Sequence, residues 1–333
     1  MHYTMEPEGE KFHPRMIIWQ LTDDDRQEGT TGEPSLLTTQ ECLLILESIA
    51  RLAKPIIVLT GKNVILRRDL YDIVEYGGAL GLKVIVEAEA EDLSDEIIRK
   101  FSTFGPKTFR ILIGNVVKEG QEQRFERTAE FLDLEEKVRT LKKAGFEIHL
   151  SLTVGQPDAR QLAINHDYAF RNAADGFYCH LSFKEPIQDD EQDPETDDTV
   201  GDFIESIASV KQYSPDHMYF SPQCVKYGFR DVDDWFPGDD DSDAKGSASE
   251  WRHWCLGGKT FAFISERGKV QVCSGLPIPC GDLRNNGYNF QQIWQESEVF
   301  QYLRDHDRSC TKTRDTVTAT TEPATRKKPN EEK

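Results

Sequence analysis

The sequence predicts an α/β protein built on a parallel sheet, and two observations carry this prediction. From Met16 to about Tyr213, short apolar runs alternate with amphipathic stretches of helical period. The apolar runs are rich in Ile, Val and Leu, as strands covered on both faces should be. Such alternation implies parallel strands joined by right-handed crossovers. We predict a partial (β/α)6 barrel of the TIM type, while periodicity alone equally permits a doubly wound open sheet.

Six strands are predicted in this region, over residues 16–21, 56–59, 83–87, 108–113, 147–154 and 176–181. Helices are predicted over 38–52, 67–80, 94–104, 128–144, 160–173 and 199–213. Thr38 followed by Glu41 is a capping-box start, and Gly81 and Gly145 stand where two helices should end. In both architectures a ligand would sit at the carboxyl ends of the strands, where the loops 22–32, 60–67 and 114–127 lie.

The character of the sequence changes near residue 251. Residues 260–265 and 269–273 flank a turn at 266–268 and predict a β-hairpin, and an amphipathic helix is predicted over about 290–304. We divide the chain into an N-terminal extension (1–15), a barrel (16–215), an acidic bridge (216–254), a hairpin-and-helix module (255–310) and a tail (311–333). The tail is rich in Thr, Pro, Lys and Glu and is predicted to be disordered.

Composition excludes some partners. The 333 residues carry a net charge of −19, which argues against nucleic acid and against an anionic membrane surface. No apolar run approaches the roughly 20 residues that span a bilayer, and residues 1–15 contain no apolar signal core. We expect a cytoplasmic protein that binds neither nucleic acid nor membrane.

The first motif follows the first predicted strand. Residues 17–32 read Ile-Ile-Trp-Gln-Leu-Thr-Asp-Asp-Asp-Arg-Gln-Glu-Gly-Thr-Thr-Gly. This segment resembles the radical S-adenosylmethionine (SAM)/SPASM family, in the branch with haem-biosynthesis and peptide-modifying members. In that family a similar strand runs into Cys-x3-Cys-x2-Cys, which holds a [4Fe–4S] cluster through thiolates. Those positions fall here on Asp25, Gly29 and Gly32, so the resemblance implies a degenerate member that lacks the radical SAM cluster.

The second motif lies at the end of the second predicted strand. The family pattern Thr-Gly-Gly-Glu-Pro-Leu-x-Arg-x-Asp-Leu is matched here at Thr60, Gly61, Leu66, Arg67, Asp69 and Leu70. Its central Gly-Glu-Pro is replaced by Lys62, Asn63 and Val64. In the family this stretch binds the amino group of SAM, and a lysine there should weaken the binding of a cation. A third SAM-side region, residues 108–127, keeps only Gly114 of its pattern.

The C-terminal module keeps more of the resemblance. Cys255 is followed after twelve residues by Gly268 and after four more by Cys273, as in the opening of the SPASM cysteine pattern. The resemblance implies a SPASM/twitch-like module with one auxiliary [4Fe–4S] site at Cys255, Cys273, Cys280 and Cys310, of which Cys255 and Cys273 are the preferred metal ligands. Four cysteines also suit tetrahedral zinc, and buried thiols without metal are a third interpretation.

Two other groups of residues have a functional and a structural interpretation. Asp23, Asp24 and Asp25 could hold a hard cation or form a solvated loop. Lys62, Arg67 and Arg68 could receive an anionic ligand, whereas Arg67 and Asp69 could instead cap a helix start. Cys42 and Cys179 are predicted to be buried core thiols.

Three functional hypotheses follow. The first is a pseudoenzyme that does not cleave SAM and acts as a binding or scaffold partner in radical-SAM-dependent cofactor or peptide modification. Its partner would be an active radical SAM enzyme or the peptide or small molecule that this enzyme modifies. The second is a working enzyme that uses the auxiliary [4Fe–4S] site or a pocket built from Asp23–Asp25, Lys62, Asn63 and Arg67. Electron transfer through the auxiliary cluster is a third hypothesis.

Overall fold

The computed structural model describes residues 12–23, 35–104, 107–113, 129–154, 165, 167–169, 171–181, 218–220, 257–273 and 276–305. These residues form one ten-stranded sheet in the order β10-β9-β8-β1-β2-β3-β4-β5-β6-β7. The first seven strands are β1 (Met16–Gln20), β2 (Ile56–Thr60), β3 (Lys83–Glu89), β4 (Thr108–Ile113), β5 (Glu147–Val154), β6 (Gly176–Leu181) and β7 (Met218–Phe220). They pair in parallel throughout. The parallel-sheet prediction is therefore confirmed.

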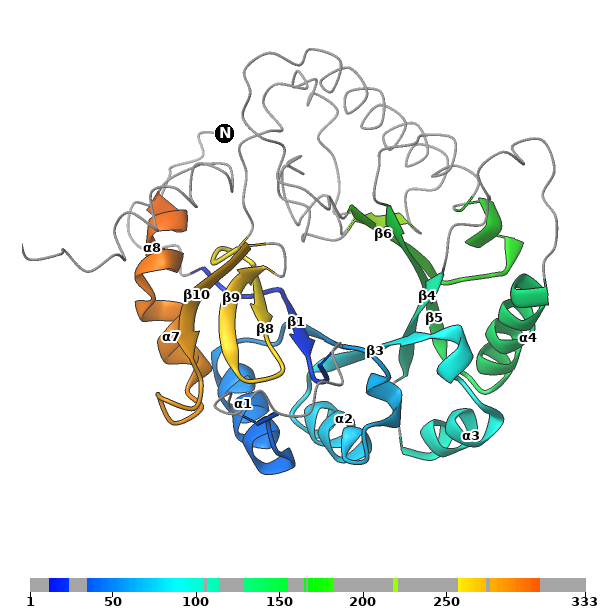
Figure 1. The fold of residues 1–333 in the computed structure, drawn as a ribbon, viewed down its shortest axis with the longest axis horizontal. Coiled ribbons are helices and arrows are strands. Elements are labelled where there is room, and N and C mark those ends of the chain that lie inside the picture. Colours follow the sequence, from blue (N-terminus) through cyan, green and yellow to red (C-terminus); the bar gives the residue numbers. More distant parts are fainter. Residues whose placement is uncertain are drawn as a thin grey trace, which may run out of the picture.

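The sheet is curved and open, and its helices cover the outer, convex side (Figure 1). These helices are α1 (Thr39–Leu52), α2 (Leu70–Ala79), α3 (Asp95–Phe104) and α4 (Ala129–Lys143), with short 3-10 turns η1 (Val64–Leu66) and η2 (Ala90–Asp92). A doubly wound sheet would carry helices on both faces. The one-sided arrangement is that of a partial barrel.

Side-chain alternation separates the outer face of each strand from the inner face. Phe109 of β4 meets Phe101 of α3, with ring centroids 5.2 Å apart, and Phe146, with centroids 5.1 Å apart. Phe109 therefore points to the helix layer. Its neighbour Arg110 must point to the barrel interior, although it is almost completely buried.

Helix α1 begins as the sequence predicts. The backbone N–H of Glu41 donates to Thr38 Oγ1 over 3.4 Å, and the backbone N–H of Thr38 donates to Glu41 Oε2 over 2.7 Å. This capping box satisfies two donors that a helix start leaves without partners. The helix then buries Cys42, Ile45 and Ile49 against the sheet.

The C-terminal hairpin continues the sheet of the barrel. Strand β8 (Phe261–Ile264) pairs in parallel with β1, and β9 (Lys269–Cys273) and β10 (Leu276–Asp282) follow in antiparallel order. The predicted hairpin is confirmed, but β10 was not predicted because Pro277 and Pro279 interrupt a strand pattern. Proline is tolerated here because β10 is an edge strand.

The predicted helix at 290–304 is broken into α7 (Phe290–Glu296) and α8 (Glu298–Asp305). Ser297, with ψ of 121°, leaves the helical region between them. The short β7 was also not predicted. Half of the predicted helix 160–173, all of 199–213, most of the bridge 216–254, and the tail 311–333 lie outside the described residues.

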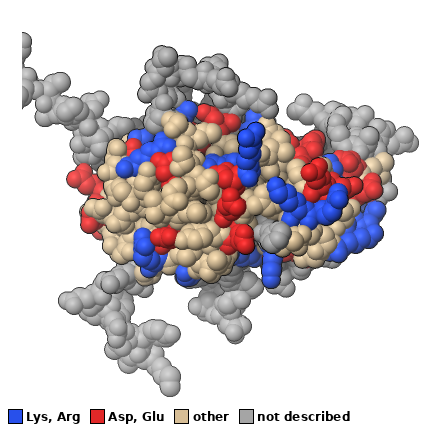
Figure 2. Space-filling view, turned by 90° about the horizontal axis from the view of Figure 1, so that it is seen from below, with Lys and Arg blue, Asp and Glu red and all other residues tan. Residues whose placement is uncertain are grey.

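Over the described residues, none of the helices is both long and apolar enough to cross a membrane. Basic and acidic side chains lie beside one another over the face seen in Figure 2.

Candidate functional site

The ends of β1 and β2 approach each other closely at the mouth of the barrel. The backbone N–H of Leu21 donates to the Thr60 carbonyl over 2.8 Å, and Thr22 Oγ1 donates to the Lys62 carbonyl over 2.8 Å. Gly61 has φ of +125°, and a Cβ there would lie 2.3 Å from Thr22 Oγ1. Glycine is required at this position for both backbone conformation and space.

Of the replaced residues of the second motif, Lys62 is exposed and Asn63 takes a left-handed conformation with φ of 53°. Asn63 makes no side-chain cap to η1. The three predicted SAM-motif positions Gly61, Lys62 and Asn63 are therefore together in one turn beside the end of β1.

Arg67 is a structural residue. Its Nε and Nη2 donate to the two oxygens of Asp69, over 2.6 and 3.0 Å, and Thr39 Oγ1 donates to the same carboxylate. Its Nη1 reaches the Leu21 carbonyl over 2.8 Å, and Nη2 reaches the Leu37 carbonyl over 2.7 Å. Burial alone would raise the pKa of Asp69, but the bonds from Arg67 and Thr39 hold it below its ordinary value.

Arg67 therefore bonds to Leu21, which precedes residues 24–34, and to Leu37, which follows them. It connects the two flanks of this segment. Its guanidinium is committed to Asp69 and to carbonyl groups, so the interpretation of Arg67 as a receptor for an anionic ligand is wrong. The structural alternative, in which Arg67 and Asp69 cap a helix start, agrees with the structure in position only: the two residues pair directly before α2, but the Asp69 side chain makes no capping hydrogen bond to that helix. Arg68 is exposed.

Asp23 forms an ion pair with Arg267, whose Nη2 lies 3.0 Å from Asp23 Oδ2 and whose Nη1 lies 2.6 Å from Glu266 Oε1. The other two residues of the acidic triplet, Asp24 and Asp25, lie outside the described residues, as do Gly29 and Gly32. Arg267 also lines an open pocket of about 310 Å³, whose other lining residues include Gln20, Phe263 and Lys269. This pocket is next to the end of β1.

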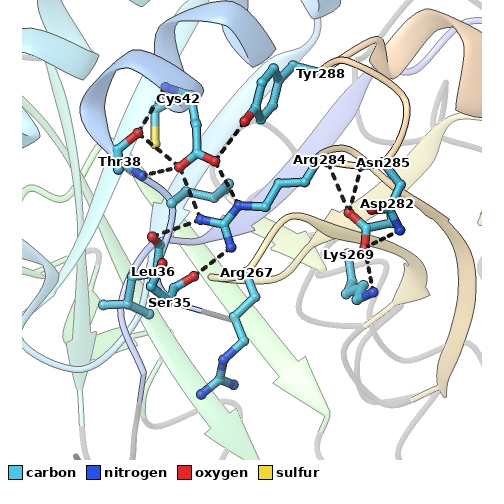
Figure 3. A network of polar contacts seen from close by, with 12 residues as sticks. Ser35, Leu36, Thr38, Cys42, Arg267, Lys269, Asp282, Arg284, Asn285 and Tyr288 are labelled. Carbon is cyan, nitrogen blue, oxygen red and sulfur yellow. Dashed lines mark hydrogen bonds and ion pairs between the residues drawn. The ribbon is translucent and has the colours of Figure 1, made fainter. Parts of the chain in front are cut away.

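A third arginine holds the segment that leads into α1 (Figure 3). Arg284 donates from Nε and Nη2 to both oxygens of Glu41, over 2.7 and 3.0 Å, and to the carbonyls of Ser35 and Leu36. Tyr288 adds a hydrogen bond to Glu41 over 2.8 Å. The bond from Arg284 is the main cause of a strongly lowered pKa of Glu41.

The C-terminal cysteines are only partly described. Cys273 is buried at the end of β9, and Cys280 is half-buried in β10, on the neighbouring strand of the same hairpin. Cys255 and Cys310 lie outside the described residues. Within the described part of the chain, no group of three or more His, Cys, Asp or Glu side chains is arranged to hold a metal ion.

Cys42 is a buried core thiol, as predicted. Burial raises the pKa of this thiol to about 12, in spite of the nearby Arg67 cation, whose Nη2 lies 3.7 Å from Sγ. Cys179 lies in β6, and its side chain is outside the described set.

Sequence reasoning missed a row of polar side chains on the inner face of the barrel. Thr60 Oγ1 donates to Glu87 Oε1 over 2.7 Å, and Arg110 Nη1 lies 3.5 Å from Glu87 Oε2. In the sheet register Glu87 is paired with Arg110, and Arg110 with His149. Polar residues inside otherwise apolar strands were the available signal, but their alignment requires the register.

The row is completed by Glu147, Ser151 and Tyr178. Glu147 Oε1 lies 2.9 Å from His149 Nε2, and this bond is the main reason that the pKa of Glu147 falls to about 2. Burial lowers the pKa of His149, which makes the imidazole neutral at pH 7. The guanidinium carbon of Arg110 lies 3.8 Å from the centroid of the Tyr178 ring, a cation–π contact.

Two proteins found by sequence comparison carry the same name. No family model matches the sequence. The chain is 27% identical over 309 residues to the AdoMet-dependent heme synthase of Methanosarcina barkeri, covering 88% of this chain and 85% of that protein. It is 24% identical over 322 residues to the AdoMet-dependent heme synthase of Oleidesulfovibrio alaskensis, covering 89% and 79%.

Solved structures show the same fold at low identity. Streptococcus suis SuiB bound to S-adenosylmethionine matches with a TM-score of 0.54 and 10% identity, over 89% of this chain. This chain spans 66% of SuiB, just under two thirds of its length. The enzyme anSMEcpe with bound AdoMet and Cp18Cys peptide matches with a TM-score of 0.52 and 10% identity, covering 87% of this chain and 82% of that one.

These solved structures share with this chain an α/β fold that contains an open parallel sheet. The chain shares the fold of these solved structures, and it is similar in sequence to proteins named AdoMet-dependent heme synthase.

Proposed function

We propose that this protein is a radical SAM-fold pseudoenzyme that does not cleave SAM and that binds a partner in cofactor or peptide modification. One observation carries the proposal. The segment that follows β1 contains Asp25, Gly29 and Gly32 at the positions of the three cluster cysteines, and residues 17–38 contain no cysteine. Glycine offers no side-chain donor, so this set does not fit a [4Fe–4S] cluster.

The preserved frame around this segment supports the proposal. Arg67, Arg267 and Arg284 bond both of its flanks. These bonds hold the two flanks of the segment in place. Lys62, beside the end of β1, also opposes the binding of a SAM amino group there.

The choice of partner rests on the relatives. Those with similar sequences are named for AdoMet-dependent heme synthesis, and SuiB has been crystallised with its precursor peptide SuiA. We propose that the partner is an active radical SAM enzyme of a comparable pathway, or the small molecule or peptide that such an enzyme modifies.

A second candidate is an enzyme or electron carrier that uses an auxiliary [4Fe–4S] cluster at Cys255, Cys273, Cys280 and Cys310. The observation in its favour is that Cys273 and Cys280 lie on adjacent strands of one hairpin. Zinc at the same residues would be a structural alternative.

One experiment tests the first proposal. The protein is purified without oxygen, reconstituted with iron and sulfide, and incubated with SAM and dithionite. We expect no 5′-deoxyadenosine above a reaction without protein, whereas an intact Cys-x3-Cys-x2-Cys enzyme treated in parallel produces it. Formation of 5′-deoxyadenosine would refute the proposal.

Metal analysis of the same sample tests the second candidate. About four iron atoms per chain, lost in a Cys255→Ala/Cys273→Ala variant, would favour an auxiliary cluster. One zinc atom per chain would favour a structural site, and a sample free of metal would favour buried thiols.

A further inference from the structure

Arg110 is the one buried arginine among the described residues, and its side chain is only 1% exposed. It lies in the third SAM-side region of the family resemblance (residues 108–127) but matches no residue of that pattern. Its ion pair with Glu87 is long, at 3.5 Å, and uses only Nη1. Taking a guanidinium out of water is costly unless its donors find acceptors. The burial of Arg110 is therefore not explained by Glu87 alone.

The donors that lack an acceptor are Nε and Nη2, and neither has a hydrogen-bond partner in the described structure. Together they form the side edge of the guanidinium, which presents two parallel N–H groups to a carboxylate. Two other arginines of this chain use that edge in this way. Arg67 binds Asp69 through Nε and Nη2, and Arg284 binds Glu41 through the same two atoms.

Arg304 also fills this edge, with the carbonyls of Gly258 and Trp294. The most buried of these arginines is thus the one whose carboxylate-binding edge has no acceptor. In a protein interior such an edge needs an acceptor, and a ligand group can supply it.

A second donor without an acceptor lies on the same inner face. Ser151 is fully buried, and its hydroxyl has no hydrogen-bond partner in the described structure. It stands two residues beyond His149, the residue paired with Arg110, and is itself paired with Tyr178. Arg110, Ser151 and Tyr178 therefore occupy neighbouring positions on three adjacent strands, on the side of the sheet that faces away from the helices.

We propose that Arg110 and Ser151 bind a carboxylate group of a ligand held inside the partial barrel. The two oxygens accept from Nε and Nη2 of Arg110, and Ser151 adds a third donor. The Tyr178 ring lies against the face of the Arg110 guanidinium. Glu87 accepts from Nη1 of the same guanidinium. This inference deepens the proposed binding function by naming the class of ligand, a carboxylic acid.

The site lies close to the SAM-motif turn. Glu87, the ion-pair partner of Arg110, accepts a hydrogen bond from Thr60 at the end of β2, directly before Gly61. Because the proposed function leaves no cluster to hold SAM at this mouth, we assign the carboxylate to a second molecule, and the SAM arm of the test below separates the two sources.

The test uses the full-length protein and acetate as the probe, with its neutral analogue acetamide and with chloride and sulfate at equal ionic strength. Melting is followed by circular dichroism. We expect acetate to raise Tm in a saturable manner beyond chloride, and acetamide to have no effect. Arg110→Lys, which keeps the charge but loses the paired donors, should abolish the acetate shift. The matched control Arg139→Lys, at an exposed position on α4, should leave it unchanged.

Ser151→Ala provides a second variant with a smaller disturbance of the fold. Loss of one hydrogen bond to a charged ligand should weaken apparent acetate affinity roughly tenfold. The proposal is overturned if acetate and chloride act alike on the wild-type protein, if sulfate acts as well as acetate, or if the acetate shift survives in folded Arg110→Lys. A SAM-induced shift that Arg110→Lys removes would overturn the assignment to a second molecule.

The proposed function can fail without this inference failing. Release of 5′-deoxyadenosine would refute the pseudoenzyme proposal and leave the carboxylate site intact. Absence of an acetate effect would refute the carboxylate site alone.

Discussion

Arg284 binds both carboxylate oxygens of Glu41 although the two residues are 243 positions apart. Glu41 lies in the first turn of α1, where it also completes the capping box with Thr38, and Arg284 follows β10. One carboxylate thus stabilises a helix start and joins the C-terminal hairpin to the barrel. The interaction fixes the segment 35–38 on the C-terminal side of the cysteine-free loop.

The first prediction concerns this pair. Glu41→Gln and Arg284→Met should each lower the free energy of unfolding by about 2 kcal/mol, since each removes charge-assisted hydrogen bonds and leaves a partner incomplete. A double-mutant cycle in urea should show a clear coupling energy between them. The exposed pair of Arg51 and Glu47 is the control, and Arg51→Met should change stability by less than about 0.5 kcal/mol. Additive effects of the Glu41 and Arg284 variants would contradict the prediction.

Gly61→Ala tests the close approach at the mouth. The variant should lose about 2 to 4 kcal/mol of stability, since an alanine there meets both an unfavourable φ and the Thr22 backbone. Gly78→Ala is a matched control, because Gly78 is inside α2 and a Cβ there meets nothing within 4 Å. It should be neutral or should stabilise by up to about 1 kcal/mol. Equal stability of the two variants in urea denaturation would argue against the described turn.

Cys42 should be unreactive in the folded protein. Its pKa is raised to about 12 by burial, so the reactive thiolate is scarce at pH 8. Mass spectrometry of peptides after iodoacetamide treatment should show Cys42 unmodified in native protein and modified in urea. Cys280, which is half-buried, should react before Cys42. Rapid native modification of Cys42 would show that the barrel wall opens readily at α1.

His149 should make stability depend on pH. Its pKa is lowered by burial from an ordinary value of 6.5, so the unfolded state binds more protons than the folded state just below that value. Stability is therefore fully present above about pH 6.5 and is lost as pH falls through the lowered pKa. Glu147 has a pKa lowered from 4.5 to about 2. Its contribution to stability is therefore lost only as the pH falls from about 4.5 towards 2.

The measurement is urea denaturation at several pH values between about 5 and 7, the window set by the His149 pKa. His149→Gln should flatten the loss of stability that the wild-type protein shows on acidification. His13→Gln, at an exposed position, should leave the slope as it is. An unchanged slope in His149→Gln would mean that the imidazole is not buried as described.

Much of the fold could be predicted because strands and helices leave local patterns. Alternating apolar and amphipathic segments located the six predicted strands and the capping box at Thr38. The same patterns failed at β10, where prolines hide an edge strand, and at Ser297, where one helix becomes two. Periodicity reports which face is buried, but the edge position of β10 depends on pairing with β9.

The candidate site divides in a similar way. The sequence alone determined that the loop after β1 has no cysteine and that Lys62 and Asn63 stand in the second motif, because these are facts of composition and order. Only the tertiary structure decided that Arg67 is bound by Asp69, that Arg284 reaches Glu41, and that Glu87, Arg110 and His149 form one row. The last two relationships join segments that are distant in sequence, so they depend on which elements become neighbours when the open sheet assembles.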